Sequence, residues 1–163
     1  MNGFAPGLFD KLMGDGGRSN THGIVTRLTL EELKDMVARD LESLLNTRAV
    51  IHDDTLKPYP ECSKSIVAYG LNDFAGMSLA STDDRAHICR CLEKAIGAHE
   101  PRLRNVRASL EIQDGSINRL NFAITALLVV NTAQEPVNFD AVLQPSTLQY
   151  SINKTRHPVR IGV

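Results

Sequence analysis

The spacing of apolar residues changes at Pro101, and this change constrains the fold more than any other feature of the chain. Before Pro101, apolar residues recur every three or four positions over residues 29–46 and 83–99, which predicts two long amphipathic helices. After Pro101 they alternate with polar residues, which predicts consecutive strands. Helices followed by consecutive strands favour an α+β fold with a mainly antiparallel sheet.

The ends of the helices carry their own signals. Thr29 and Glu32 are three positions apart and predict a capping box at the start of the first helix. Ser81 or Thr82 is expected to cap the second helix. Residues 49–61 are expected to form a loop, and a short helix over 63–69 is expected to end at Gly70 in a left-handed cap.

The strand pattern predicts a four-stranded sheet over residues 106–112, 120–130, 137–143 and 148–152. Asp114-Gly115 predicts the turn between the first two strands. We expect the two long helices and the short one to pack on one face of this sheet. The last strand follows Pro145 and is the expected sheet edge, which either accepts an extended partner segment or is protected by the basic tail.

The chain is expected to divide into three regions. Residues 1–28 are rich in glycine and predict a flexible N-terminal arm. Within it, residues 6–13 place Leu8, Phe9 and Leu12 at helical spacing, so this segment either packs back on its own domain or docks into a partner groove. Residues 29–153 form the predicted folded domain, and residues 154–163 form a basic tail.

Composition excludes several classes of protein. The 163 residues carry a net charge of −1, which supplies no field to collect nucleic acid or an acidic membrane. No apolar run is long enough for membrane insertion. Three cysteines are an odd number without a disulfide framework, which favours a reducing compartment and a cytoplasmic location.

The usual catalytic motifs are not found in the sequence. There is no glycine-rich phosphate loop and no nucleophile elbow, so we expect no enzyme activity, no cofactor and no small-molecule substrate. Cys89 and Cys91 lie two apart on a predicted helix, so their side chains diverge by about 200° and do not predict a metal site. The acid pairs at 53–54 and 83–84 fit a polar loop and the first turn of a helix.

Glu100-Pro101-Arg102 is the candidate functional site. A carboxylate at the end of a helix faces the negative end of the helix dipole, and proline fixes the backbone between the two opposite charges. The pair either locks the helix to the sheet or holds charged groups of a partner through bidentate arginine geometry. No second acid stands out in the sequence, as a glycosidase would require.

Several segments resemble one family when they are taken in order. The helix end Leu41–Arg48, the segment Ser65–Asp73, the Glu100-Pro101-Arg102-Leu103 signature and the sheet segments 122–128 and 136–139 all match it. The N-terminal segment Gly7–Leu12 is similar to its "SLFDRL" opening, with Gly7 and Lys11 as departures. Over about residues 6–153 the chain resembles the type VI secretion baseplate subunit TssE, which is related to a phage baseplate wedge protein labelled lysozyme-like.

This resemblance implies a structural subunit that binds the wedge proteins TssF and TssG, with TssK on the same wedge. It also implies a role in initiating the contractile sheath of TssB and TssC. It favours an assembly contact at Glu100, Pro101 and Arg102 over an internal lock. The alternatives are a peptidoglycan hydrolase, as the lysozyme-like label would imply, and a wedge subunit of another phage-like contractile machine.

Overall fold

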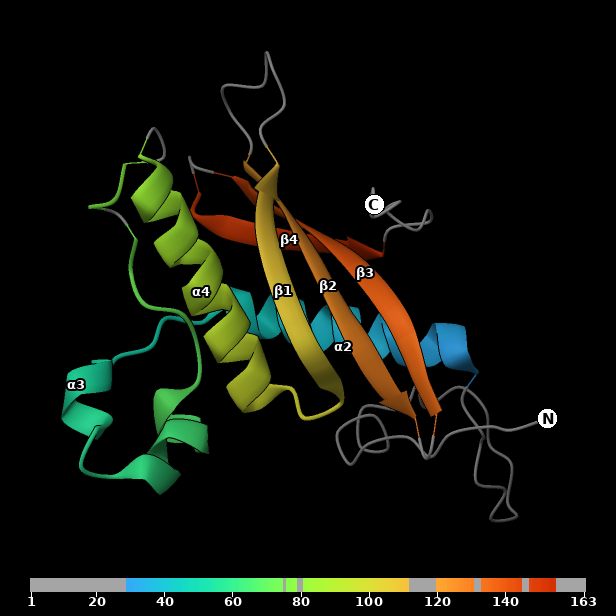
Figure 1. Ribbon diagram of the computed structural model, residues 1–163, viewed down its shortest axis with the longest axis horizontal. Helices are drawn as coiled ribbons and strands as arrows, with labels where there is room; N and C mark the ends of the chain where they lie inside the picture. The colour runs from blue at the N-terminus through green and yellow to red at the C-terminus, as the bar shows by residue number, and fades with distance from the viewer. Residues whose placement is uncertain are drawn as a thin grey trace. The chain divides into compact units, whose positions relative to one another are not determined.

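A computed structural model describes residues 29–74, 76–78, 81–111, 120–130, 133–144 and 147–154 (Figure 1). The chain divides into two compact units between Val37 and Ala38, and helix α2 (Leu30–Asn46) passes from one to the other. The remaining elements belong to the second unit. The predicted arm with its segment 6–13, the turn at Asp114-Gly115 and residues 155–163 lie outside the described residues.

Helix α2 begins with the predicted capping box. The Thr29 hydroxyl accepts a hydrogen bond from the Glu32 backbone N–H at 3.2 Å, and the Thr29 backbone N–H donates to the Glu32 carboxylate at 2.7 Å. The Thr29 backbone N–H and the Thr29 hydroxyl both donate to the Glu32 carboxylate, and these two bonds lower the pKa of Glu32. The prediction is confirmed because each side chain satisfies an amide that the first turn leaves unpaired.

Helix α4 (Thr82–His99) also begins as predicted. Its cap is Ser81, whose hydroxyl accepts from the Asp84 backbone N–H at 3.3 Å. The buried stripe of α4 consists of Ile88, Leu92 and Ile96. The four-residue spacing of these side chains places them on one face of the helix.

The connection between α2 and α4 differs from the prediction. The expected loop at 49–61 contains a one-turn helix, α3 (Asp53–Leu56). The expected helix at 63–69 is instead two short 3₁₀ turns, η1 (Pro60–Lys64) and η2 (Ile66–Ala68). Ser65 separates them in an extended conformation, and its hydroxyl accepts from the Val67 N–H at 3.3 Å, which competes with a continuous helix.

The sheet has four antiparallel strands in the order β1-β2-β3-β4, as predicted. They are β1 (Leu103–Glu111), β2 (Leu120–Val130), β3 (Ala133–Gln144) and β4 (Gln149–Lys154). Strands β1 and β3 begin earlier than the alternation of apolar residues suggested. The added residues of β3 at 133–136 are exposed, so they pair with β2 without adding an apolar signal. In β1 the added residue Leu103 is buried, but the pairing with β2 shifts its register between Arg104 and Arg107, so Leu103 is out of phase with the alternation that follows.

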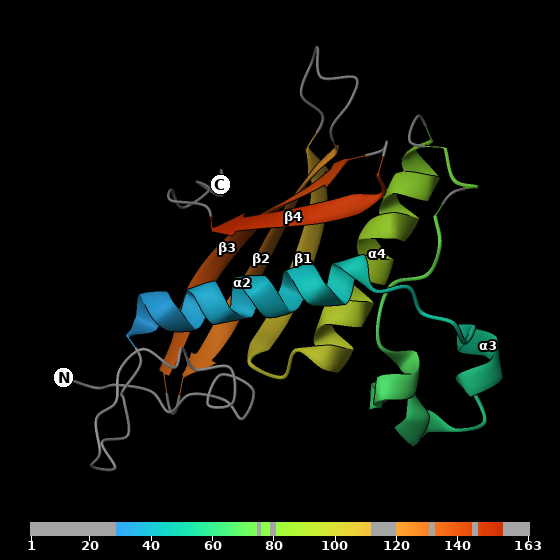
Figure 2. The same cartoon turned by 180° about the vertical axis from the view of Figure 1, so that it is seen from behind.

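One face of the sheet carries the apolar core of the second unit. Pairing places Phe122 opposite Ala141 and Ile124 opposite Phe139, and all four are buried. Figure 1 shows α4 running beside β1, and Figure 2 shows the C-terminal half of α2 beside β4. The sheet therefore lies between helical neighbours at both of its edges.

Candidate functional site

The Glu100-Pro101-Arg102 corner is built around a buried carboxylate. Glu100 is 4% exposed and accepts three hydrogen bonds from Arg102. The Arg102 backbone N–H donates at 3.2 Å and its Nε at 2.6 Å, and Nη2 donates to the second carboxylate oxygen. The side-chain contacts have the bidentate geometry that the Arg-carboxylate pair favours.

Asp40 of α2 completes this corner. Nη2 of Arg102 also donates to the Asp40 carboxylate, so one guanidinium joins α2 to the segment between α4 and β1. The hydrogen bonds with Glu100 raise the pKa of Arg102, against the opposing effect of partial burial, and Asp40 adds to the rise. Asp40 was missed by the sequence argument because it lies 62 residues from Arg102 and has no local spacing signal.

The exposure of the corner is uneven. The Glu100 side chain is 5% exposed, whereas Arg102 is 29% exposed and Asp40 is 57% exposed. Pro101 is also exposed. The geometry therefore supplies the internal lock, and only Pro101, Arg102 and Asp40 reach the surface where another molecule can touch them.

The segment around Gly70 meets the end of α2 nearby. Leu71 N–H donates to the Thr47 carbonyl at 2.8 Å, and Ala49 N–H donates to the Leu71 carbonyl at 2.9 Å. Gly70 has φ +118°, and a Cβ there would lie 2.6 Å from the Thr47 oxygen. Gly70 follows Tyr69, the C-cap of η2, with a positive φ, as predicted, and the close approach of two backbones is a second reason for glycine here.

Tyr69 ties this segment to the same corner. Its ring packs edge-on against His99, with 5.3 Å between the ring centroids. Burial raises the pKa of Tyr69, and the charges of Asp40 and Glu100 add to the rise. The three motifs that end α2, surround Gly70 and follow α4 therefore converge in one region of the fold.

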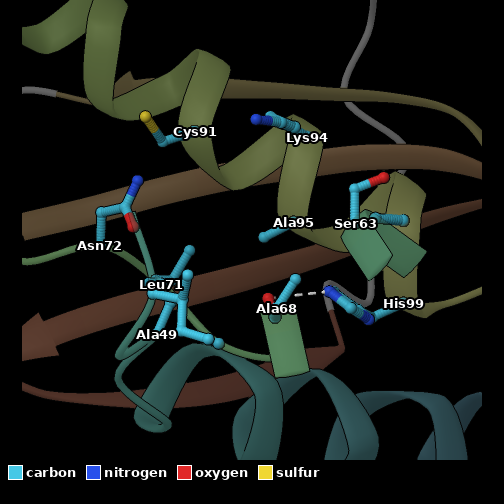
Figure 3. Close-up of a pocket in the computed structure, with 12 residues that line it drawn as sticks. Ala49, Ser63, Ala68, Leu71, Asn72, Cys91, Lys94, Ala95 and His99 are labelled. Atoms are coloured by element: carbon cyan, nitrogen blue, oxygen red, sulfur yellow. Dashed lines mark hydrogen bonds between the residues drawn. The ribbon is translucent and has the colours of Figure 1, made fainter. Parts of the chain in front are cut away.

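Figure 3 shows a small cavity beside this region, lined by Ala49, Leu71, Cys91 and His99 among others. The His99 Nε2 lies 3.0 Å from the Ala68 carbonyl oxygen, so the ring is already engaged. The cavity measures about 50 Å³, which is room for a few water molecules. Its size and its engaged histidine do not suit a substrate.

The edge strand β4 is closed by side chains of α2. The Tyr150 backbone N–H donates to Asn46 Oδ1 at 2.7 Å, and the Tyr150 carbonyl accepts from Asn46 Nδ2 at 2.9 Å. The Ile152 N–H donates to Glu42 Oε2 at 2.9 Å. The prediction that β4 forms a sheet edge is confirmed, and the N–H and carbonyl of Tyr150 and the N–H of Ile152 already have partners on α2.

The opposite edge, strand β1, is closed by α4 in the same manner. The Ala108 N–H donates to Glu93 Oε1 at 2.9 Å. Burial raises the pKa of the Cys89 thiol on the same helix, and a hydrogen bond from the Leu110 backbone partly opposes this. Polar side chains on each helix thus occupy backbone donors that an isolated edge strand would leave unpaired.

Within the described ranges, no group of three or more His, Cys, Asp or Glu side chains is arranged to hold a metal ion. Cys62, Cys89 and Cys91 form no disulfide with one another. No helix in the described part of the chain is long and apolar enough to cross a membrane. The predicted docking residues Leu8, Phe9 and Leu12 lie outside the described residues.

Comparison with known proteins identifies a family. A family model described as baseplate wedge protein gp25 matches residues 31–133. No curated protein matches the chain. The matched region contains α2, the Gly70 segment, α4, the Glu100-Pro101-Arg102 corner and strands β1 and β2.

Proposed function

We propose that this chain, which belongs to the family of baseplate wedge protein gp25, is a structural subunit of the baseplate wedge in a type VI secretion system. The family includes TssE of type VI secretion systems, and its members have a structural role in phage-like baseplates. The observation that carries the proposal is the match over residues 31–133, more than half of the chain. The order of motifs from residue 6 to 153 supports the narrower assignment to TssE.

In this role the chain binds the wedge proteins TssF and TssG, with TssK on the same wedge, and helps to initiate the TssB/TssC sheath in the cytoplasm. The test is co-expression of the full chain with TssF and TssG from the same genome, followed by purification on a tag carried by TssG. We expect a stable complex. If the chain elutes alone while TssF and TssG remain together, the assignment to this wedge is wrong, and wedge proteins of another contractile machine become the expected partners.

The corner suggests how the chain meets a partner. Glu100 is too deeply buried to touch another protein, so its proposed role is to hold the Arg102 guanidinium in one orientation. Pro101 and the exposed part of Arg102 then form a rigid contact. The arm residues Leu8, Phe9 and Leu12 supply a second contact by docking into an apolar groove of a wedge protein.

Two conservative variants separate the contact from the lock. Arg102→Lys keeps the positive charge but removes the bidentate geometry, whereas Asp40→Asn removes one ion pair and leaves Arg102 in place. If Arg102 contacts a partner, Arg102→Lys loses the complex at temperatures where it remains folded, and Asp40→Asn retains it. If both folded variants assemble normally, Arg102 is an internal lock only.

A lysozyme-like hydrolase is the competing function, and the buried corner argues against it. A general acid must reach the glycosidic oxygen, but the Glu100 carboxylate is 5% exposed and already accepts three hydrogen bonds. A turbidity assay on peptidoglycan tests this reading. Clearing that is lost in Glu100→Gln would overturn the structural assignment.

A further inference from the structure

A larger cavity lies away from the Glu100-Pro101-Arg102 corner. It measures about 180 Å³, and its apolar wall includes Phe74, Met77, Leu120, Leu143 and Leu148. An apolar protein cavity of about 150 Å³ can hold a benzene molecule. This cavity is therefore large enough for one big apolar side chain.

Tyr150 lines the cavity and carries a hydroxyl that has no hydrogen-bond partner among the described residues. The residue is 3% exposed. Burial raises the pKa of Tyr150 to about 12, while Arg48 partly opposes the rise. A buried hydroxyl without a partner costs stability, and such groups in native proteins call for an explanation.

Leu148 is held at the same cavity in an unusual conformation. Its φ is +55°, in the left-handed region that side-chain-bearing residues rarely adopt. The residue is also 46% exposed, although its side chain is a large apolar group. Backbone strain of this kind concentrates at ligand clamps and binding sites, and here it holds an apolar side chain at the rim of a cavity.

Two charged residues, Arg48 and Asp73, line the cavity. Asp73 is already engaged in an interaction within the chain. Arg48 is exposed, and no ion pair joins it to another described residue. A guanidinium beside an apolar socket favours a ligand whose carboxylate lies next to an apolar group.

We propose that this cavity binds an extended segment of a partner protein, taking one large apolar side chain into the socket and an adjacent carboxylate onto Arg48. The Tyr150 hydroxyl donates to a carbonyl oxygen of the bound segment. This surface is separate from the corner, and the proposal does not depend on which contractile machine the chain serves.

The test uses the full isotope-labelled chain and the blocked peptide acetyl-Gly-Phe-Asp-Gly-amide. Its matched control replaces the aspartate by lysine. In an NMR titration we expect the aspartate peptide to shift the resonances of Leu120, Leu143 and Tyr150, and the lysine peptide to bind about tenfold more weakly, as expected for loss of one charge-assisted hydrogen bond. Equal binding of the two peptides, or shifts elsewhere on the surface, would overturn the proposal.

Two variants distinguish binding from folding. Tyr150→Phe removes the unpaired hydroxyl, and Leu148→Gly relieves the positive φ, so neither is expected to lower the melting temperature. Both variants are expected to bind the aspartate peptide about fivefold to tenfold more weakly. Ile66→Ala, at an exposed position that does not line the cavity, is the control and should leave peptide binding unchanged.

Two other occupants give different results in the unliganded chain. If a second copy fills the cavity, the resonances of its lining residues will depend on protein concentration. If the chain's own arm fills it, Phe9→Ala will shift the same resonances in the full chain without added peptide. Either result overturns the proposal of a partner segment.

Discussion

Replacing Arg102 by methionine is expected to destabilise the protein strongly, although Arg102 is partly exposed. The variant keeps most of the side-chain volume but removes two of the three hydrogen bonds to Glu100. Glu100 is then left 4% exposed with one bond from a backbone amide. Removing one partner of a buried ion pair typically costs about 3–5 kcal/mol.

The expected loss lies at the lower end of this range, about 3 kcal/mol, because the 29% exposure of Arg102 allows water to reach the vacated space. Urea unfolding followed by circular dichroism measures it from the shift in midpoint at an unchanged slope. Arg104→Met is the matched control: this arginine is exposed two residues further along, and its change is expected to stay within about 0.5 kcal/mol.

A double variant sharpens the test. In Glu100→Gln/Arg102→Met no charge remains buried, so the protein is expected to be more stable than Arg102→Met alone. A loss below about 1 kcal/mol in Arg102→Met, or no recovery in the double variant, would refute the reasoning that Glu100 depends on Arg102 for its charge compensation.

Three further predictions concern other parts of the fold. Gly70→Ala is expected to lower the free energy of unfolding by at least about 2 kcal/mol, because of the positive φ and the 2.6 Å approach to the Thr47 oxygen. Gly97→Ala, in open space on α4, should raise it by about 0.5–1 kcal/mol, and thermal melts compare the two variants. Between pH 10 and 12 the free energy of unfolding is expected to fall by about 2–3 kcal/mol through Tyr150. The folded pKa of about 12 lies above the unfolded value of 10, so the tyrosine of the unfolded chain loses its proton first. This loss should disappear in Tyr150→Phe when unfolding is measured across that pH range. Asn46→Ala should expose the β4 edge and lower the free energy of unfolding by about 1 kcal/mol. Sedimentation experiments should then show increased self-association, and unchanged sedimentation would argue against the role of Asn46 in closing this edge.

The sequence by itself determined the features whose signals are local. Thr29 and Glu32 lie within one helical turn, and Ser81 caps the turn that follows it, so spacing alone was enough to place both helix starts. The alternation of apolar residues after Pro101 placed the strands for the same reason, since neighbouring positions point to opposite faces. The start of β3 was missed because its exposed residues leave no apolar pattern, and the start of β1 was missed because the register shift between Arg104 and Arg107 interrupts the alternation.

Only the tertiary structure decided which distant side chains meet. Asp40 is 62 residues from Arg102, and Asn46 is 104 residues from Tyr150. No periodic signal connects such positions, because their contact depends on strand register and on the path of the chain between them. The sequence identified Glu100, Pro101 and Arg102 as an unusual corner, but the fold supplied Asp40 and buried Glu100, and it also assembled the cavity around Tyr150.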